Sequence, residues 1–289
     1  MRRLLLLPLL LCACASGPPP VAHTSLRARD EDTLLDLARA HSLGFGEITA
    51  ANPGVDPWVP GVGKRVVLPT VHIPPPAPAK GIVINIADQR LYLFKGEGPP
   101  LSYPIGIGRP GWVTPLGATS VVRKSDAPTW YPTASALKED PTLPGAVPPG
   151  PENPLGTHAI YLGWPRYLIH GTNEPYGVGR RVSRGCIRLY PEDILRLYAQ
   201  VEVGTAVRVV NASIKTGWMR GELYLEAHPP IVQESEHTPV VDKPLTKEFK
   251  RQLRAIAGES VQRLDWDRVE RTLRERRGMP VRVTWTPAS

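Results

Sequence analysis

Short runs of β-branched and aromatic residues follow one another through the middle of the chain, and turn-forming residues separate them. Runs of this kind predict strands, here over residues 82–86, 90–94, 101–105, 119–123, 159–162, 168–170 and 206–210. The first two are joined by Ala87-Asp88-Gln89, which indicates a hairpin. Apolar residues at helical spacing predict one helix within this series, over residues 191–198. The pattern therefore predicts a mainly β fold, a sandwich or barrel with a capping helix.

A smaller unit with a different pattern precedes these strands, over residues 22–72. Residues 24–28 and 63–69 are typical of strands. Between them, residues 32–39 and 45–52 have apolar positions at helical spacing, and the second stretch ends at Pro53. The predicted element order of this unit is therefore β-α-α-β.

Proline-rich stretches divide the chain, which has 34 prolines in 289 residues, about double the usual fraction. Residues 74–78 separate the small unit from the large unit at 80–211, and we interpret them as a linker between two units that fold separately. Residues 144–154 interrupt the strand series and predict an excursion loop that could serve as a lid.

The last part of the chain, residues 212–289, has two further helical patterns. Phe249, Leu253 and Ile256 fall on one face of the first, and the second begins at Asp267 and ends near Gly278. Residues 281–285 predict a returning strand. We find no chemistry in this partly helical extension and expect it to serve packing.

The N-terminus is typical of a secretory signal, because Arg2 and Arg3 precede an apolar run. The run ends in Leu11-Cys12-Ala13-Cys14, which resembles a bacterial lipobox. That resemblance implies removal of residues 1–13 and lipidation of Cys14, while ordinary cleavage after Ala15 is the alternative. Neither residue 15 nor residue 16 is aspartate, which favours transfer to the outer membrane of a Gram-negative bacterium.

Composition and charge exclude several other classes of protein. An apolar fraction of 42% argues against disorder. No later apolar run approaches the roughly 20 residues of a membrane span, which excludes an integral transporter or channel. The net charge is +8, and the basic residues are scattered, so we expect no nucleic-acid partner.

Of the three cysteines, Cys186 would be alone in the exported chain, although structural cysteines in an oxidising compartment normally come in pairs. It is therefore either buried and inert or retained for chemistry. His170 precedes it by 16 residues, and an imidazole nearby could take the thiol proton. Gly185 would permit close backbone approach and free amides for an oxyanion. The spacing alone leaves both alternatives open.

The surrounding residues favour the chemical alternative. His170-Gly171-Thr172, followed by Ser183-Arg184-Gly185-Cys186-Ile187-Arg188, resembles the motif of the YkuD-type L,D-transpeptidase family. The resemblance extends over residues 81–210 and includes the segments 88–94, 103–108, 114–117 and 153–156. It implies a YkuD-like β-sandwich or barrel as the catalytic domain.

The small unit resembles a LysM domain through Asp32-Thr33-Leu34, Ala51-Asn52-Pro53-Gly54 and residues 66–69. Residues 29–32 depart from the family because they lack the usual Gly-Asp turn. The resemblance implies that the unit binds the N-acetylglucosamine-containing glycan of peptidoglycan. A structural unit without a ligand is the alternative.

The transpeptidase resemblance also implies roles for the motif residues. Cys186 matches the nucleophile, His170 the general base, and the Gly171 carbonyl would orient the second ring nitrogen. Amides near Gly185 and Cys186 would form the oxyanion hole. Ser183 would shape the turn by hydrogen bonding, and Arg188 would hold either a substrate carboxylate or the loop.

Two further expectations concern residues around this motif. Arg184 stands where many relatives have histidine, and its charge would favour the Cys186 thiolate unless the side chain points away and braces the loop. Aromatic and hydroxyl side chains that could line a peptide cleft, or be ordinary core and surface residues, are Trp130, Tyr131, Trp164, Thr172 and Tyr176.

The family acts on peptidoglycan stem peptides without a metal or cofactor. The resemblance implies that Cys186 cleaves the terminal D-alanine from a tetrapeptide stem and passes the acyl group to an amine, which gives a 3-3 cross-link or anchors a lipoprotein. An L,D-carboxypeptidase and a non-catalytic peptidoglycan-binding lipoprotein are the alternatives. We expect a periplasmic enzyme, anchored by lipid to the outer membrane.

Overall fold

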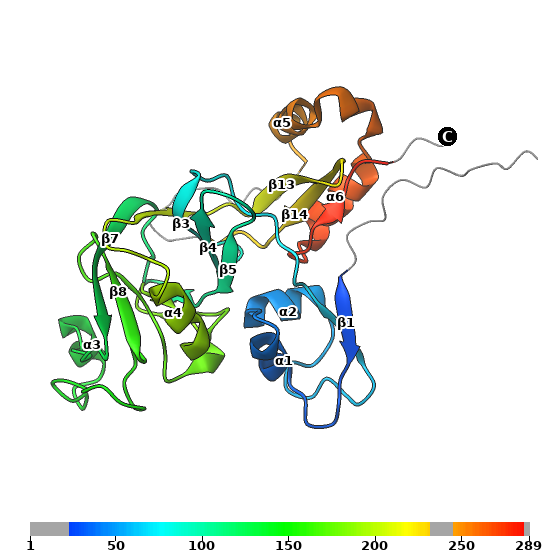
Figure 1. Ribbon diagram of the computed structural model, residues 1–289. Coiled ribbons are helices and arrows are strands. Elements are labelled where there is room, and N and C mark those ends of the chain that lie inside the picture. Colours follow the sequence, from blue (N-terminus) through cyan, green and yellow to red (C-terminus); the bar gives the residue numbers. More distant parts are fainter. Residues whose placement is uncertain (1–22, 232–244, 286–289) are drawn as a thin grey trace, which may run out of the picture.

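The computed structural model describes residues 23–231 and 245–285. The predicted signal at 1–13 and the predicted lipidation site Cys14 lie outside these residues. Within the described ranges, no helix combines the length and apolarity that a membrane span requires. Buried hydrophobic side chains form separate clusters in the small unit, the large unit and a C-terminal unit, and Figure 1 shows these units in blue, in cyan to yellow-green, and in yellow to red.

The small unit has the predicted element order. Strand β1 (Thr24–Arg27) pairs antiparallel with β2 (Arg65–Leu68), and helices α1 (Leu34–Ala40) and α2 (Phe45–Ala51) lie between them in the chain. Helix α1 begins where predicted because the Thr33 hydroxyl accepts a hydrogen bond from the Asp36 amide. The unit closes around a small apolar core.

The large unit is mainly β, as predicted. Its eight-stranded sheet has the order β11-β9-β8-β7-β12-β3-β4-β5. The strands of the unit are β3 (Lys80–Asn85), β4 (Arg90–Lys95), β5 (Leu101–Pro104), β6 (Ile107–Gly108), β7 (Gly117–Asp126), β8 (His158–Leu162), β9 (Leu168–His170), β10 (Arg181–Ser183), β11 (Ile187–Arg188) and β12 (Ala206–Val210). Helix α4 (Pro191–Tyr198) packs its buried face into the same core. The shorter α3 (Ala134–Glu139), which was not predicted, lies in the excursion between β7 and β8, before the loop predicted at residues 144–154.

The sheet is curled so that its two edge strands approach each other. Two residues after β5, at one edge, the Gly106 amide donates to the Arg188 carbonyl at 2.8 Å, and the Arg188 amide donates back at 2.9 Å. Because Arg188 belongs to β11 at the other edge, these bonds close the curl. Strand β6, which follows, then pairs in parallel with β10. The loop that carries Cys186 is thereby held between β10 and β11.

The C-terminal unit contains a hairpin that the sequence reasoning missed. Strands β13 (Ile214–Met219) and β14 (Glu222–Ala227) pair around a turn at Arg220 and Gly221, and β15 (Val281–Arg282) adds to β14. The predicted helices are present as α5 (Lys247–Ala257) and α6 (Trp266–Glu275). Ile256 is 44% exposed, so the buried face of α5 runs through Leu253 and Ala257 instead.

A buried ion network attaches this hairpin to the large unit. The Lys215 ammonium on β13 lies 2.6 Å from Asp88, between β3 and β4, and 2.7 Å from Glu226 on β14. The Tyr92 hydroxyl also donates to Asp88, at 2.7 Å. Glu226 in addition accepts from the Ile73 amide, at 2.6 Å, so the segment before the predicted linker is tied to the hairpin.

The small unit is joined to the large unit by a buried ion pair. The Arg90 guanidinium on β4 lies 2.8 Å from Glu47 on α2, and both side chains are almost fully buried. The Tyr190 hydroxyl, at the start of α4, donates to the Leu43 carbonyl at 3.0 Å. Removing either unit would leave a charge without its partner. The two units are therefore in buried contact, and their separate folding stays a prediction.

The start of helix α2 completes this contact through backbone groups. The first amides of a helix have no partner inside it. Here the Gly46 amide donates to the Gly179 carbonyl at 3.0 Å, and the Phe45 amide donates to the Val178 carbonyl at 3.3 Å. Gly179 has a positive φ of 77°, and a Cβ there would lie 2.1 Å from the Phe45 nitrogen. The chain segment just before β10 is thus fixed by the small unit.

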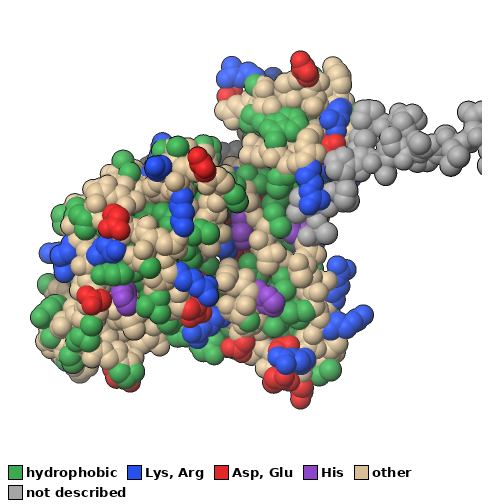
Figure 2. Space-filling view, viewed as in Figure 1, with side chains coloured by type: hydrophobic (Ala, Val, Ile, Leu, Met, Phe, Trp, Pro, Cys, Tyr) green, Lys and Arg blue, Asp and Glu red, His purple; other side chains and the backbone are tan. Residues whose placement is uncertain are grey.

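Charged side chains are distributed over all three units. On the face shown in Figure 2, lysine and arginine side chains are interspersed with acidic ones and with apolar surface. The exposed pair between Arg39 on α1 and Glu192 on α4, at 2.9 Å, adds a contact at the rim of the interface between the small and large units. The visible surface therefore offers no broad field of one sign.

We expect Glu47→Gln to destabilise the whole chain by about 3–5 kcal/mol, because the buried Arg90 loses its counter-charge while the shape of the side chain is kept. The measurement is the free energy of unfolding in guanidinium chloride. Arg39→Gln is the matched control, since it removes the exposed pair in the same interface and should cost less than about 1 kcal/mol. Equal losses from the two variants would contradict a buried electrostatic joint.

Candidate active site

The register of two short parallel strands places His170 and Cys186 on one face of the sheet. Ile187 on β11 is opposite Ile169 on β9, and Arg188 is opposite His170. Both isoleucines are fully buried in the core. Successive side chains of a strand point to opposite faces. His170, Arg188 and Cys186, which is two residues before Arg188, therefore share the face away from the core.

His170 is held as a neutral base. Its Nδ1 lies 2.6 Å from the Gly171 carbonyl oxygen, which requires that Nδ1 carry the proton and donate it. The lone pair is therefore on Nε2. Burial and the positive charge of Arg188 lower the pKa of His170 to about 3. As the pH falls below about 6.5, His170 becomes protonated in the unfolded chain before it does so in the folded chain. His170 therefore contributes stability at neutral pH that is lost in acid.

The Cys186 thiol is also neutral at rest. It is half-buried, and its Sγ donates to the Arg166 carbonyl at 3.4 Å. Burial raises the pKa of Cys186, although the Leu168 amide and the Arg188 charge act in the opposite direction. An uncharged thiol beside an uncharged imidazole means that the thiolate forms only when the proton moves to His170.

Ser183 shapes the turn that presents the thiol. Its hydroxyl donates to the Cys186 carbonyl at 2.6 Å and accepts from the Gly185 amide at 3.2 Å. Gly185 has a φ of 101°, and a Cβ there would lie 2.9 Å from both the Tyr167 ring and the Val113 carbonyl. The Gly185 amide is thus engaged, which corrects its expected place in the oxyanion hole. Among the described residues, the Cys186 amide has no acceptor.

Arg184 does not lie against the thiol. Its guanidinium is 2.7 Å from the Glu139 carboxylate, which also contacts Arg109. The charge that lowers the pKa of Cys186 is that of Arg188. The structure therefore corresponds to the second expectation for Arg184, a side chain that points away and braces the loop.

Arg188 is largely buried on the active face. Its side chain is only 14% exposed and makes a long ion pair with Glu174, at 3.4 Å. Its Nε is buried and has no partner among the described residues. One edge of the guanidinium is thus directed to the loop at residues 174–177, and another has no hydrogen-bond partner. Arg188 could therefore hold either the loop or a substrate carboxylate, as expected from the sequence.

The candidate substrate-binding aromatic residues have different local surroundings. Trp130 exchanges backbone hydrogen bonds with Val147 inside the excursion, and its neighbour Tyr131 is 69% exposed. Trp164 packs against the main core and against the edge of Tyr167. These three aromatic residues therefore lie in two separate places.

Thr172 and Tyr176 are used by the structure in other ways. Thr172 is buried, and its hydroxyl accepts from the Glu174 amide at 2.9 Å, so it forms a turn. The Tyr176 hydroxyl donates to Asp36 of the small unit, at 3.2 Å. One side chain thus serves a local turn and the other an interface, and their place in a peptide cleft stays a prediction.

Sequence reasoning missed several residues around the thiol. Arg166 supplies the carbonyl that accepts from Cys186, and Tyr167 packs over Gly185 and donates to Val113. Asn153 is fully buried, and its amide donates to the Pro128, Val147 and Pro148 carbonyls. Only Asn153 lay in a segment that the family resemblance had marked; the positions of Arg166 and Tyr167 depend on the fold.

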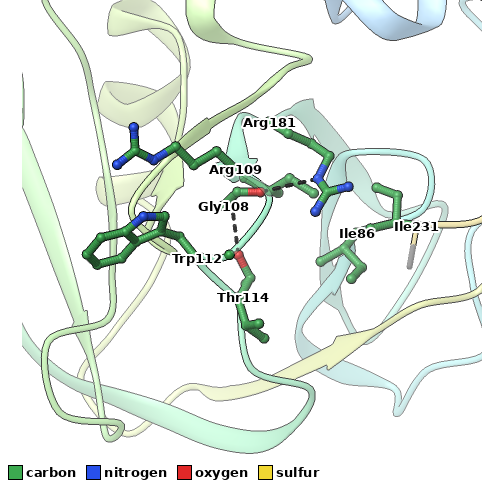
Figure 3. A pocket seen from close by; sticks show the side chains of 10 residues that line it. Ile86, Gly108, Arg109, Trp112, Thr114, Arg181 and Ile231 are labelled. Atoms are coloured by element: carbon green, nitrogen blue, oxygen red, sulfur yellow. Dashed lines mark hydrogen bonds between the residues drawn. The ribbon is translucent and has the colours of Figure 1, made fainter. Parts of the chain in front are cut away.

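A pocket lies behind the nucleophile loop (Figure 3). Thr114 connects the two, because its hydroxyl accepts from the Gly108 amide at 3.2 Å and donates to the Gly185 carbonyl at 2.9 Å. Figure 3 shows Arg109 and Trp112 on one side of Gly108 and Thr114, with Arg181 and Ile231 on the other. The residues that line the pocket are Ile86, Ile107, Gly108, Arg109, Gly111, Trp112, Val113, Thr114, Arg181 and Ile231.

Asp88, Glu226 and His228 form a buried group of potential metal ligands away from Cys186. The Lys215 ammonium contacts both carboxylates, at 2.6 and 2.7 Å, and His228 lies 2.6 Å from Glu226. The position that a cation would need is therefore occupied by a protein cation. This group fits a structural ion network rather than a metal site.

Comparisons with known proteins find similarity to L,D-transpeptidases. The YkuD family model, described as the L,D-transpeptidase catalytic domain, matches residues 79–209. The probable L,D-transpeptidase ErfK/SrfK of Salmonella typhimurium is 40% identical over 264 residues, which are 87% of this chain and 82% of the relative. The probable L,D-transpeptidase YcfS of Escherichia coli is 39% identical over 264 residues, 88% of this chain and 81% of the relative. A crystal structure of L,D-transpeptidase 3 from Mycobacterium tuberculosis aligns with a TM-score of 0.38 and 22% identity, over 46% of this chain and 61% of that one.

We expect the two arginines of the motif to differ in their effect on the thiol. Arg188→Gln removes the charge that favours the thiolate, so the pKa of Cys186 rises and alkylation by iodoacetamide shifts to higher pH. Arg184→Gln should leave the alkylation profile where it is in the wild type. The measurement is the alkylation rate against pH for the three proteins. A shift in the Arg184 variant as large as that in the Arg188 variant would reject this assignment.

Proposed function

The chain belongs to the L,D-transpeptidase family, and from that premise we propose that Cys186 and His170 exchange the terminal D-alanine of a peptidoglycan stem peptide for an amine. The family membership makes the chain an L,D-transpeptidase. The observation that carries the assignment of residues is the hydrogen bond from His170 Nδ1 to Gly171, because it leaves Nε2 free to accept a proton on the face that also holds the thiol.

In the first half of the proposed reaction, Nε2 of His170 takes the thiol proton as Sγ of Cys186 attacks the carbonyl carbon of the third residue of the stem. The Cys186 amide donates to the oxyanion that forms. The bond between this carbon and the nitrogen of D-alanine then breaks. The proton on Nε2 passes to that nitrogen, and D-alanine leaves a thioester on Cys186.

In the second half, an amine attacks the thioester carbonyl, His170 accepts a proton from it, and the thiolate leaves. If the amine belongs to the diaminopimelate side chain of another stem, the product is a 3-3 cross-link. If it is a lysine of a lipoprotein, that protein becomes anchored to the wall. If water replaces the amine, the enzyme acts as an L,D-carboxypeptidase. We favour an amine acceptor because the curated relatives bear the name transpeptidase.

The small unit would bring the enzyme to its polymer. Its β-α-α-β order and its resemblance to LysM domains support glycan binding, and the contacts of α2 with residues 178–179 would place that glycan beside the active face. A catalytic pair with a defined tautomer argues against a non-catalytic wall-binding protein. The signal-like N-terminus and the candidate lipid site Cys14 support export to the periplasm and attachment to the outer membrane.

The test is a muropeptide assay with purified enzyme and tetrapeptide substrate, read by mass spectrometry. We expect D-alanine release with formation of the 3-3 dimer. Cys186→Ala should abolish both by at least about a thousandfold, since no other group can form the thioester. Its unfolding midpoint should remain near that of the wild type. D-alanine exchange that persists in this variant would contradict the mechanism, and tripeptide without dimer would identify the carboxypeptidase.

A further inference from the structure

Two arginines next to the nucleophile loop converge on a single carboxylate. Arg109 Nη2 lies 2.8 and 2.7 Å from the two Glu139 oxygens, and Arg184 Nη2 lies 2.7 Å from one of them. Two cations thus share one directly bonded anion. The adjacent Asp140 carboxylate is bonded to Thr142, and it interacts with the Arg184 charge without a hydrogen bond to it.

The two arginines are fixed by the framework of the site. Each directly follows one of the paired strands β6 and β10, and the Arg109 amide donates to the Ser183 carbonyl at 2.9 Å. Both guanidinium groups also lie over the Trp112 ring, at 5.5 and 5.8 Å from its centre. A fixed pair of guanidinium groups is a typical site for carboxylate recognition.

Glu139, by contrast, is the exchangeable partner. It is the last residue of α3, a helix of six residues inside the excursion between β7 and β8. Its side chain is 39% exposed, and those of Arg109 and Arg184 are 39% and 35% exposed, so water and solutes reach the ion pairs. Exposed ion pairs of this kind contribute little free energy. An incoming anion could therefore replace Glu139 at low cost.

We propose that Arg109 and Arg184 bind a free carboxylate of the donor stem peptide, and that Glu139 occupies this site in the unliganded enzyme. This inference rests on the proposed function. Arg184 is two residues from Cys186, a length of chain that spans at most about 7 Å. The arginine side chains extend from there away from the thiol, so the bound carboxylate lies further along the peptide than the scissile carbonyl. The terminal D-alanine and the diaminopimelate side chain each offer such a group.

The test compares kcat and KM for the tetrapeptide among variants. Arg109→Gln and Arg184→Gln should each raise KM about tenfold with little change in kcat, as expected for the loss of a charge-assisted hydrogen bond. Glu139→Gln should lower KM about two- to fivefold, because an internal competitor is removed. Arg208→Gln, which removes an exposed charge from β12, is the control and should leave both constants unchanged.

A second arm identifies the carboxylate. Donor peptides are prepared with the D-alanine carboxylate, or the diaminopimelate side-chain carboxylate, converted to a carboxamide. On the donor whose recognised carboxylate has been converted, the arginine variants and the wild type should have equal KM values. On the other donor, the KM values of the variants should be higher than that of the wild type. If the variants differ equally from the wild type on both donors, or if Glu139→Gln raises KM, the group is only a brace of the excursion and the inference is overturned.

Binding without turnover separates this inference from the proposed function. Calorimetry of the tetrapeptide with Cys186→Ala, alone and combined with Arg184→Gln, should show the same loss of affinity as the KM values. Wild-type enzyme that binds the peptide in this arginine-dependent manner but releases no D-alanine would contradict the proposed function alone. Wild-type turnover with no effect of either arginine would contradict the inference alone.

Discussion

The paired hydrogen bonds between Gly106 and Arg188 are the constraint on which the site depends. They join the two edges of the sheet and satisfy the backbone of the edge strand β11, which would otherwise be open to solvent. A Cβ on Gly106 would lie 2.7 Å from the Gly177 carbonyl, so the closure also needs glycine at this position. With β11 fixed, Arg188 is placed opposite His170 and Cys186 is presented at the start of the strand. The same closure brings β6 to β10 and sets Arg109 beside Arg184.

Buried charges, rather than a shared apolar core, connect the three units. The Glu47–Arg90 pair joins the small unit, and Lys215 with Asp88 and Glu226 joins the C-terminal hairpin. Such pairs add little net stability relative to apolar contacts, but removing one partner leaves a buried charge unpaired, which is costly. They therefore favour the arrangement of units in which every buried charge is paired. The contact of α2 with Val178 and Gly179 lies a few residues before β10. A glycan bound to the small unit would thus be held at a defined place relative to the thiol.

The sequence was sufficient for the longer elements and for the chemical pair, because both depend on local signals. The β-α-α-β unit, helix α4 and strands β3, β4, β5, β7, β8, β9 and β12 follow from apolar periodicity and caps, and His170 with Cys186 follows from a motif. The short strands β6, β10 and β11 and helix α3 were not predicted. The β13–β14 hairpin was missed although Arg220-Gly221 marks its turn. The fixed docking of the small unit could not be predicted, since it depends on single charges, Glu47 and Arg90, that are distant in the chain. The position of the Arg184 side chain could not be predicted either, because its partner Glu139 belongs to an excursion whose sequence has no clear helical or strand periodicity.

The low basicity of His170 has opposite effects on the two halves of catalysis. Burial and Arg188 disfavour the imidazolium, so taking the proton from Cys186 is uphill. The same features make the imidazolium a strong acid, which favours delivery of the proton to the departing amine of D-alanine. Arg188 also favours the thiolate, which offsets part of the first cost. A thiol that is neutral until a carbonyl is in place is less exposed to oxidants, because oxidation follows thiolate character. For an enzyme with a single thiol in its described residues, a weakly basic His170 is therefore consistent with both turnover and survival of the nucleophile.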